Sequence, residues 1–184
     1  MKNRLGRKEW IDAGLKALSE QGIDSVRVER LAAALGVTKG SFYWHFKNRN
    51  VLLSALLEEW QTRATNDVIT QVEKRGGSAR TRLHTLFTIA MEADGHLDMA
   101  IRAWATKDST AQTALSTIDK RRFSYLVALF TELGFSNDQA TARARLVYNA
   151  HVGQFALGVS AQTQKSQLDE LDHIFEMLVA KASN

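Results

Sequence analysis

The segment VERLAAALGVTKGSFYWHFK, residues 28–47, constrains the fold of this chain more than any other. Apolar residues recur at helical spacing on both sides of Gly36, and a glycine at that place permits a tight turn. Phe42 and Phe46 lie four residues apart, so they share one face of the second helix and are predicted to anchor it in a core. The segment therefore predicts two short helices joined by a sharp turn.

Two further aromatic residues, Tyr43 and Trp44, fall on the outer side of the second helix. Ordinary packing is the alternative explanation, but Phe42 and Phe46 already fill the inward face. Large aromatic side chains left on the outside of a short helix are typical of a binding surface. We therefore predict that Tyr43 and Trp44 contact another molecule.

The rest of the chain also favours helices, which makes the predicted fold class all-α. The sequence has no proline, 45% of its residues are apolar, and no strand pattern stands out. Thr38 is predicted to cap the third helix, and Ser136 with Gln139 forms the capping-box pattern S-x-x-Q. Apolar periodicity predicts helices over about residues 5–21, 28–35, 39–47, 48–75, 79–93, 97–107, 110–133, 136–159 and 167–182.

These helices are predicted to form two domains. Three short helices make a helix-turn-helix bundle over residues 1–48, and the others make a helical domain over residues 49–184. Asn48 is placed to cap the helix that joins them. That helix is predicted to run unbroken to Arg75, which gives it a length of ~40 Å.

The positive charge of the chain is concentrated near its N-terminus. Residues 1–49 hold ten lysines and arginines against five acidic residues, whereas residues 50–184 hold fourteen against fifteen. A basic N-terminal region in an otherwise nearly neutral chain suggests that this region has a polyanionic partner. A solvated charged surface is the alternative that charge alone leaves open.

The composition also sets expectations about the compartment and about bound groups. There is no cysteine, so disulfides and thiolate metal sites are excluded, and we expect neither a metal nor a cofactor. The first twenty residues lack an apolar signal core, and the sequence has no uncharged apolar run of ~18 residues. We therefore expect a cytoplasmic protein that has no membrane partner.

One motif connects the N-terminal segment to a known family. The sequence GVTKGSFYWHFKNRNVLL closely resembles the signature of TetR-family transcriptional regulators, and the upstream pattern W-x-x-A-G-x-x-x-L resembles theirs as well. The match covers about the first fifty residues. The remainder is similar only in length and helical layout.

The resemblance implies that the third helix is a recognition helix that enters the major groove of DNA. Gly40 has no side chain, so the backbone there can approach the duplex closely. Tyr43 and His45 match family positions that grip phosphates, and Trp44 matches one that touches bases. The residues that the resemblance assigns to DNA contact are Arg27, Thr38, Lys39, Gly40, Ser41, Tyr43, Trp44, His45 and Arg49.

Two positions depart from the family pattern. Arg27 stands where the family usually has a serine or threonine that caps the second helix, so either Arg27 reaches a phosphate or Ser25 serves as the cap. Asn50 replaces a common glutamate, which weakens one capping-type contact. Three basic residues near the N-terminus are candidates for an arm along the duplex, although a loose terminus is the alternative for the first two: Lys2, Arg4 and Arg7.

A single recognition helix reads only a few base pairs, and two-fold dimers pair such helices on a palindrome. The second half of the predicted penultimate helix, LVYNAHVGQFALGV, is apolar nearly all the way round, so it must be covered on both sides. The resemblance also suggests a dimer seam made from the last two helices; burial within one subunit is the alternative. The candidate interface residues are Leu146, Ala150, Gly153, Ala156, Leu157, Phe175 and Leu178.

Family members usually bind a small effector in the second domain, and a hydrophobic pocket would suit an apolar or aromatic one. Core packing is the alternative for each residue that we assign to this pocket: Trp60, Phe87, Met91, Trp104, Tyr125 and His151. Four charged residues could either contact the effector in the pocket or form surface salt bridges: Arg102, Asp108, Asp119 and Arg122.

The leading hypothesis is a repressor that a small effector releases from a palindromic operator. A constitutive DNA-binding regulator without an effector is the second hypothesis, and the sequence does not separate the two. An all-helical enzyme is the third, and it lacks support. The histidines are scattered, and no zinc-protease, paired-carboxylate, nucleophile-elbow or phosphate-loop motif is present.

Overall fold

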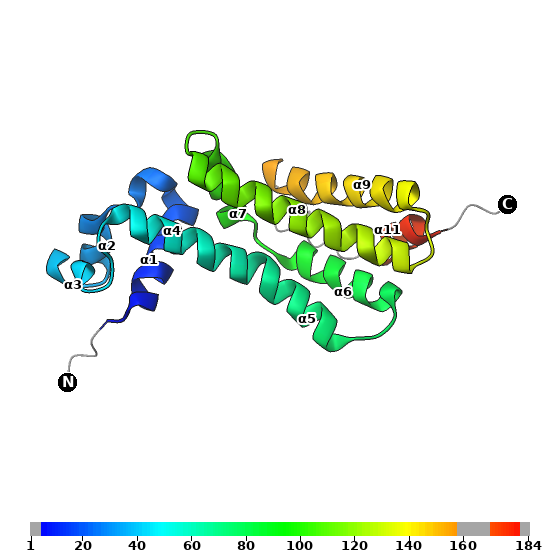
Figure 1. Ribbon diagram of the computed structural model, residues 1–184, viewed down its shortest axis with the longest axis horizontal. Helices are drawn as coiled ribbons and strands as arrows, with labels where there is room; N and C mark the ends of the chain where they lie inside the picture. The colour runs from blue at the N-terminus through cyan, green and yellow to red at the C-terminus, as the bar shows by residue number, and fades with distance from the viewer. Residues whose placement is uncertain (1–4, 158–169, 181–184) are drawn as a thin grey trace. The chain divides into compact units, whose positions relative to one another are not determined.

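The computed structural model describes residues 5–157 and 170–180, and within these ranges all regular structure is helical (Figure 1). The all-α prediction is therefore confirmed. The helices are α1 (Arg7–Gln21), the 3₁₀ turn η1 (Ile23–Ser25), α2 (Val28–Ala34), α3 (Lys39–Tyr43), α4 (Arg49–Gln61), the π turn η2 (Thr62–Asn66), α5 (Asp67–Arg75), α6 (Ala79–Glu92), α7 (His96–Ala105), α8 (Ser109–Glu132), α9 (Asn137–Ala156) and α11 (Leu171–Val179).

Two helix starts follow the predicted capping chemistry. The Asn48 Oδ1 accepts a hydrogen bond from the Val51 amide at 3.0 Å, which begins α4. The Ser136 hydroxyl accepts from the Gln139 amide at 3.3 Å, and the Gln139 side chain accepts from the Ser136 amide at 3.2 Å. This reciprocal pair satisfies two of the amides that a helix start leaves open.

At two other candidate caps, the expected side-chain hydrogen bond is not formed. Thr38 precedes α3 in an extended conformation, but its side chain makes no capping hydrogen bond within the described chain. The Ser25 hydroxyl does not cap α2 and instead donates to the carbonyl oxygens of Ala17 and Gly22, at 2.8 and 2.6 Å. Arg27 therefore begins α2 without a side-chain cap, and its Nε donates to the Asp24 carbonyl at 2.9 Å.

The predicted unbroken helix over residues 48–75 is also wrong, because the π turn η2 separates α4 from α5. At its start, the Thr62 hydroxyl donates to the Glu58 carbonyl at 3.0 Å, a contact that competes with the backbone ladder. Within it, Thr65 is buried and its hydroxyl accepts from the Arg122 Nε at 2.9 Å. These side-chain bonds accompany the wider turn, which is a feature often found at functional places in helices.

The chain packs into two compact units, and they do not follow the predicted boundary at residue 48. The first unit comprises Met1–Ala64 and Gly95–Thr117, and the second comprises Thr65–Asp94 and Ile118–Asn184. Helix α7 belongs to the first unit because it packs against α1. The helix-turn-helix segment therefore shares its unit with a helix that comes much later in the sequence.

The core of the first unit forms around aromatic rings. Trp10 and Phe42 are fully buried and meet edge to face with their ring centroids 5.3 Å apart. Phe46 stacks on Phe42 at the same centroid distance. The prediction that Phe42 and Phe46 anchor α3 and the turn after it is confirmed. Gly14 on α1 lies against Leu56 on α4, where an added Cβ would come within 2.8 Å of a Leu56 methyl carbon.

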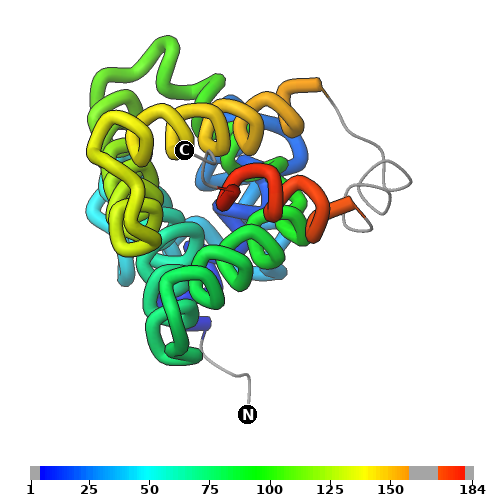
Figure 2. Tube along the Cα trace, turned by 90° about the vertical axis from the view of Figure 1, so that its right-hand side faces the viewer, coloured from blue at the N-terminus to red at the C-terminus, as the bar shows by residue number. Residues whose placement is uncertain are grey.

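The core of the second unit brings α6, α8, α9 and α11 together. Figure 2 shows α11, in red, beside α6, in green, and the two helices are in contact. Phe87 on α6 meets Phe175 on α11 edge to face with their ring centroids 5.8 Å apart. The buried members of this core are Leu83, Phe87, Leu126, Leu129, Phe130, Phe135, Ala140, Ala144, Leu171, Phe175 and Val179.

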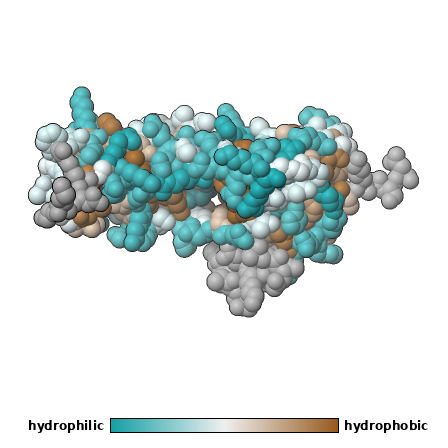
Figure 3. Space-filling view, turned by 90° about the horizontal axis from the view of Figure 1, so that it is seen from below, coloured by the Kyte–Doolittle hydropathy of each residue, from teal (hydrophilic) through white to brown (hydrophobic). Residues whose placement is uncertain are grey.

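Hydrophilic residues cover most of the face drawn in Figure 3, where hydrophobic residues form small separate groups. Among the residues that the structure describes, no helix is long and apolar enough to cross a membrane. Large apolar side chains that are exposed close together on such a surface are candidates for binding sites.

Candidate nucleic-acid interface

The end of α3 presents two aromatic side chains to solvent. Tyr43 is 62% exposed and Trp44 is 78% exposed. Phe42, directly before them, is fully buried, so one short segment divides its aromatic residues between the core and the surface. The predicted outward position of Tyr43 and Trp44 is confirmed, although Trp44 and His45 lie just beyond the α-helix rather than within it.

The start of α3 is open as well. Thr38, Lys39 and Gly40 are exposed, and Ser41 is half-buried. A Cβ added to Gly40 would meet only the Thr38 hydroxyl, at 3.6 Å. The fold of the free protein therefore does not require glycine at position 40, which leaves room there for a close external contact.

Lys39 forms an ion pair across the turn between α2 and α3. Its Nζ lies 2.6 Å from the Glu29 Oε1, and both side chains are more than half exposed. The hydrogen bond from Lys39 is the main cause that lowers the pKa of Glu29 below its ordinary value. The sequence reasoning missed Glu29, because nothing in the local pattern shows that residues ten positions apart will pair.

Two predicted DNA-contacting side chains already have partners inside the first unit. The His45 Nε2 lies 2.9 Å from the Leu5 carbonyl oxygen, so that nitrogen carries the proton and donates. The Arg49 guanidinium donates to the carbonyl oxygens of Val26 and Ile23, at 2.6 and 3.1 Å. These bonds tie the N-terminal residues to the end of α3 and the start of α4 to the turn η1.

The other basic residues that are predicted to contact DNA have different neighbours in the structure. Arg27 is exposed and bonded to the Asp24 carbonyl. The Arg7 guanidinium lies over the Phe46 ring, 5.0 Å from its centroid. Lys2 and Arg4 lie outside the described residues. Contact of all these residues with DNA stays a prediction.

The six residues assigned to an effector pocket are divided between the two units. Trp60 and Trp104 belong to the first unit and are buried there. The other four belong to the second unit. Phe87 is buried in its core, while Met91 and Tyr125 are half-buried against that core. His151 is half-buried, and its ring meets Phe155 edge to face. Effector binding by these residues stays a prediction.

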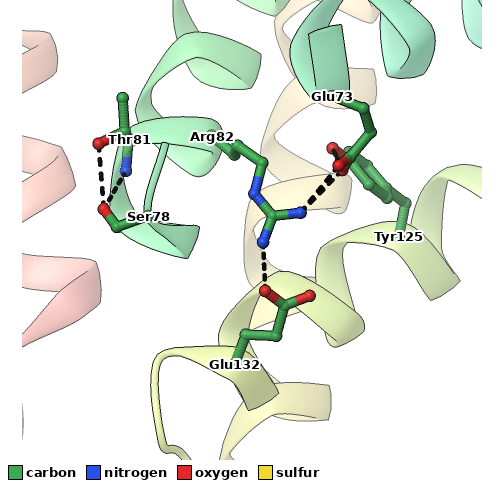
Figure 4. Close-up of polar contacts among 6 residues, drawn as sticks. All are labelled: Glu73, Ser78, Thr81, Arg82, Tyr125 and Glu132. Atoms are coloured by element: carbon green, nitrogen blue, oxygen red, sulfur yellow. Dashed lines mark hydrogen bonds and ion pairs between the residues drawn. The ribbon is translucent and has the colours of Figure 1, made fainter. Parts of the chain in front are cut away.

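Tyr125 belongs to a polar cluster that joins α5, α6 and α8 (Figure 4). The Arg82 guanidinium bonds both carboxylate oxygens of Glu73, at 3.0 and 2.9 Å, and also bonds Glu132. The Tyr125 hydroxyl donates to the Glu73 Oε1 at 2.5 Å. Burial and this bond raise the pKa of Tyr125 well above its ordinary value. The Tyr125 bond, followed by Arg82, lowers the pKa of Glu73.

The four charged residues that are candidates for effector contact all make contacts within the chain. The Arg102 Nε bonds Asp98 at 3.0 Å, one helical turn away. Arg122 bonds Thr65, as described above, and the Tyr148 hydroxyl donates to Asp119 at 2.6 Å. The Asp108 carboxylate accepts from the Ala111 amide at 2.9 Å. The contact of Arg102 with Asp98 is a salt bridge, and none of these contacts tests an effector.

An apolar surface lies on α9, directly after its most buried part. Leu146 is 63% exposed and Leu157 is 84% exposed. Ala150 and Ala156 are exposed, and Gly153 is half-buried with open space around an added Cβ. An apolar side of α9 is therefore exposed, and its coverage by a second subunit stays a prediction.

The residues of α11 that are exposed are not all those predicted to lie at an interface. Phe175 is 2% exposed and packs inside its own unit, so its assignment to an interface is wrong. Leu178 is half-buried. Met177, which the sequence reasoning missed, is 62% exposed. An isolated methionine in this helix gives no periodic signal.

Comparisons with known proteins agree with the geometry of the N-terminal segment. Residues 11–56 match the family model described as bacterial regulatory proteins, tetR family. Over 56 residues the chain is 46% identical to the class D tetracycline repressor protein of Escherichia coli, a match that covers 30% of this chain and 26% of that protein. Over 52 residues it is 40% identical to the transcriptional regulator AcrR of Shigella flexneri, covering 28% and 24%. The chain thus matches about a quarter of the length of these relatives.

Solved structures extend the likeness to the whole fold. A regulator from Saccharomonospora viridis, solved in complex with choline, superposes with a TM-score of 0.78 at 15% identity, covering 92% of this chain and 95% of that one. The reduced form of Escherichia coli NemR gives a TM-score of 0.77 at 17% identity, covering 96% and 99%. The helical fold of the chain is therefore similar to the folds of these two solved structures.

Proposed function

We propose that this chain, whose N-terminal segment matches the tetR family of bacterial regulatory proteins, is a dimeric transcriptional regulator that binds a palindromic operator in the cytoplasm. The observation that carries the proposal is the pair Tyr43 and Trp44, exposed directly beside the buried Phe42. Phosphate contacts give a protein its register on DNA, and base contacts give it specificity. An exposed phenol and an indole next to basic residues supply both kinds of contact.

Selection of bound DNA from a random pool tests this proposal. We expect a palindromic consensus whose half-sites are separated by about one helical turn of DNA, ~34 Å, or a multiple of it. The expected protein is a dimer in solution and on the selected duplex. A pool that gains no consensus after repeated rounds would refute sequence-specific binding.

We also propose that a small apolar or aromatic effector releases the protein from its operator. The names of the relatives point to regulators that respond to small molecules, and one similar structure was solved with choline. A ligand shifts the equilibrium only if it binds the two conformations with different affinities. Titration of the operator complex with a panel of apolar, aromatic and cationic compounds tests this step, and release at a saturating concentration of one of them is the expected result.

A constitutive regulator without an effector is the second candidate, and one observation favours it. Trp60, Phe87 and Trp104 have at most 7% of their surface exposed, as core residues do. If no compound changes either the melting temperature or the operator affinity, this candidate replaces the effector-responsive one.

A further inference from the structure

The stretch of sequence over residues 25–57 contains one acidic residue among five basic ones. Between Asp24 and Glu58, Glu29 is the only acidic residue in the sequence. A carboxylate repels the phosphates of DNA, so its presence on a surface that approaches a duplex weakens binding to the backbone. The basic residues in the same stretch are Arg27, Arg30, Lys39, Lys47 and Arg49.

Glu29 is positioned to act on the recognition helix directly. It lies in the first turn of α2, and Lys39 is the first residue of α3. The 2.6 Å contact between the Glu29 Oε1 and the Lys39 Nζ spans the turn, with the two side chains 59% and 57% exposed. Such an exposed ion pair is weak, so DNA can exchange with either partner.

The pair offers a donor and an acceptor side by side, and a G·C base pair offers the complement. In the major groove, guanine presents the acceptors O6 and N7, while cytosine presents an amino donor at N4. Lysine binds the guanine acceptors, and a glutamate accepts from the cytosine amino group. A phosphate, in contrast, satisfies Lys39 alone and leaves the carboxylate facing a negative charge.

We propose that Glu29 is a specificity-determining residue that, together with Lys39, selects a G·C base pair and weakens binding to DNA of other sequence. The inference rests on the proposed function and adds to it the base that this part of the surface reads. The ion pair is electrically neutral, so it contributes little to salt-dependent binding. Freeing Lys39 adds about one phosphate contact, which steepens the slope of log K against log salt concentration by about 0.9.

Glu29→Gln tests the proposal on the full-length protein. Binding is measured on the selected operator, on the operator with the relevant G·C pair changed to A·T, and on scrambled DNA, each over a range of salt concentrations. We expect affinity for scrambled DNA to rise about 3- to 10-fold, the salt slope to steepen by about 0.9, and the preference for G·C to weaken. Glu20→Gln is the matched control, because it removes the same charge from another exposed ion pair, Lys16–Glu20.

A double-mutant cycle separates the ion pair from net charge. If Glu29 acts through Lys39, then Glu29→Gln causes a smaller gain in scrambled-DNA affinity when Lys39→Gln is already present. An equal gain in both backgrounds overturns the inference, as does a Glu29→Gln variant that behaves like Glu20→Gln. These results leave the proposed function intact if the wild-type protein still selects an operator. A wild-type protein with no sequence preference refutes the proposed function and the inference together.

Discussion

The fold of the free protein does not require glycine at position 40. A substitution there therefore tests how closely DNA approaches this part of α3 without disturbing the fold. An added methyl group meets only the Thr38 hydroxyl, and alanine is the better helix former by ~0.5–1 kcal/mol. We expect Gly40→Ala to keep or raise the melting temperature while it weakens operator binding about tenfold, or ~1.4 kcal/mol. Melting curves and operator titrations check the two effects separately. Unchanged binding would show that the duplex does not approach this position closely.

A substitution of Tyr43 tests the predicted contact with a DNA phosphate. Tyr43→Phe keeps the exposed ring and removes only the hydroxyl. We expect binding to weaken by ~1 kcal/mol on operator and scrambled DNA alike, because a phosphate contact carries no sequence information. Titrations with both DNAs measure this, and Trp44→Phe is the contrasting variant, expected to change sequence preference. A Tyr43→Phe variant that binds both DNAs as tightly as the wild type would exclude a phosphate contact.

Among the elements, the contact of α5 with α8 through Glu73 and Tyr125 has a predictable pH dependence. The pKa of Glu73 is lowered, so its stabilisation is present above its ordinary pKa of 4.5 and is lost as the pH falls. The pKa of Tyr125 is raised, so its stabilisation is present below its ordinary pKa of 10.0 and is lost as the pH rises above that value.

Tyr125→Phe therefore removes a stabilising bond and part of this pH dependence. We expect the free energy of unfolding at neutral pH to fall by ~1 kcal/mol, and the loss of stability above pH 10 to become shallower. Denaturant unfolding at several pH values measures both. Tyr148→Phe, which removes the bond to Asp119 on a different pair of helices, is the matched control. A Tyr125→Phe variant with wild-type stability would show that the bond contributes nothing in solution.

The same elements show what the sequence could and could not predict. Asn48 and Ser136 were found because a cap bonds an amide three residues away, which is a local pattern. The π turn was missed because its segment TRATN has no glycine or proline, and Thr65 is held by an arginine 57 residues away. The internal bonds of Arg49 were missed for the same reason, since its acceptors lie 23 and 26 residues earlier.

At the scale of the whole molecule, we predict that the exposed side of α9 forms the dimer interface. Leu146→Glu places a charge on this surface without disturbing a core, because the side chain is 63% exposed. We expect the dimer dissociation constant to rise at least tenfold, since burying a leucine is worth ~1.5–3 kcal/mol. Sedimentation at several concentrations measures it. Val51→Glu, at an exposed residue of α4, is the control for adding an acid. If both variants dimerise like the wild type, the interface lies elsewhere.

The contact between Gly14 and Leu56 has a consequence for how chains of this design can vary. The two residues share one fixed volume, since a side chain at position 14 would occupy the space that the Leu56 methyl groups fill. Leu56 is fully buried, so it has no free direction in which to withdraw. A side chain larger than glycine at position 14 therefore requires Leu56 to shift or to be replaced by a smaller residue, and we expect these two positions to change together.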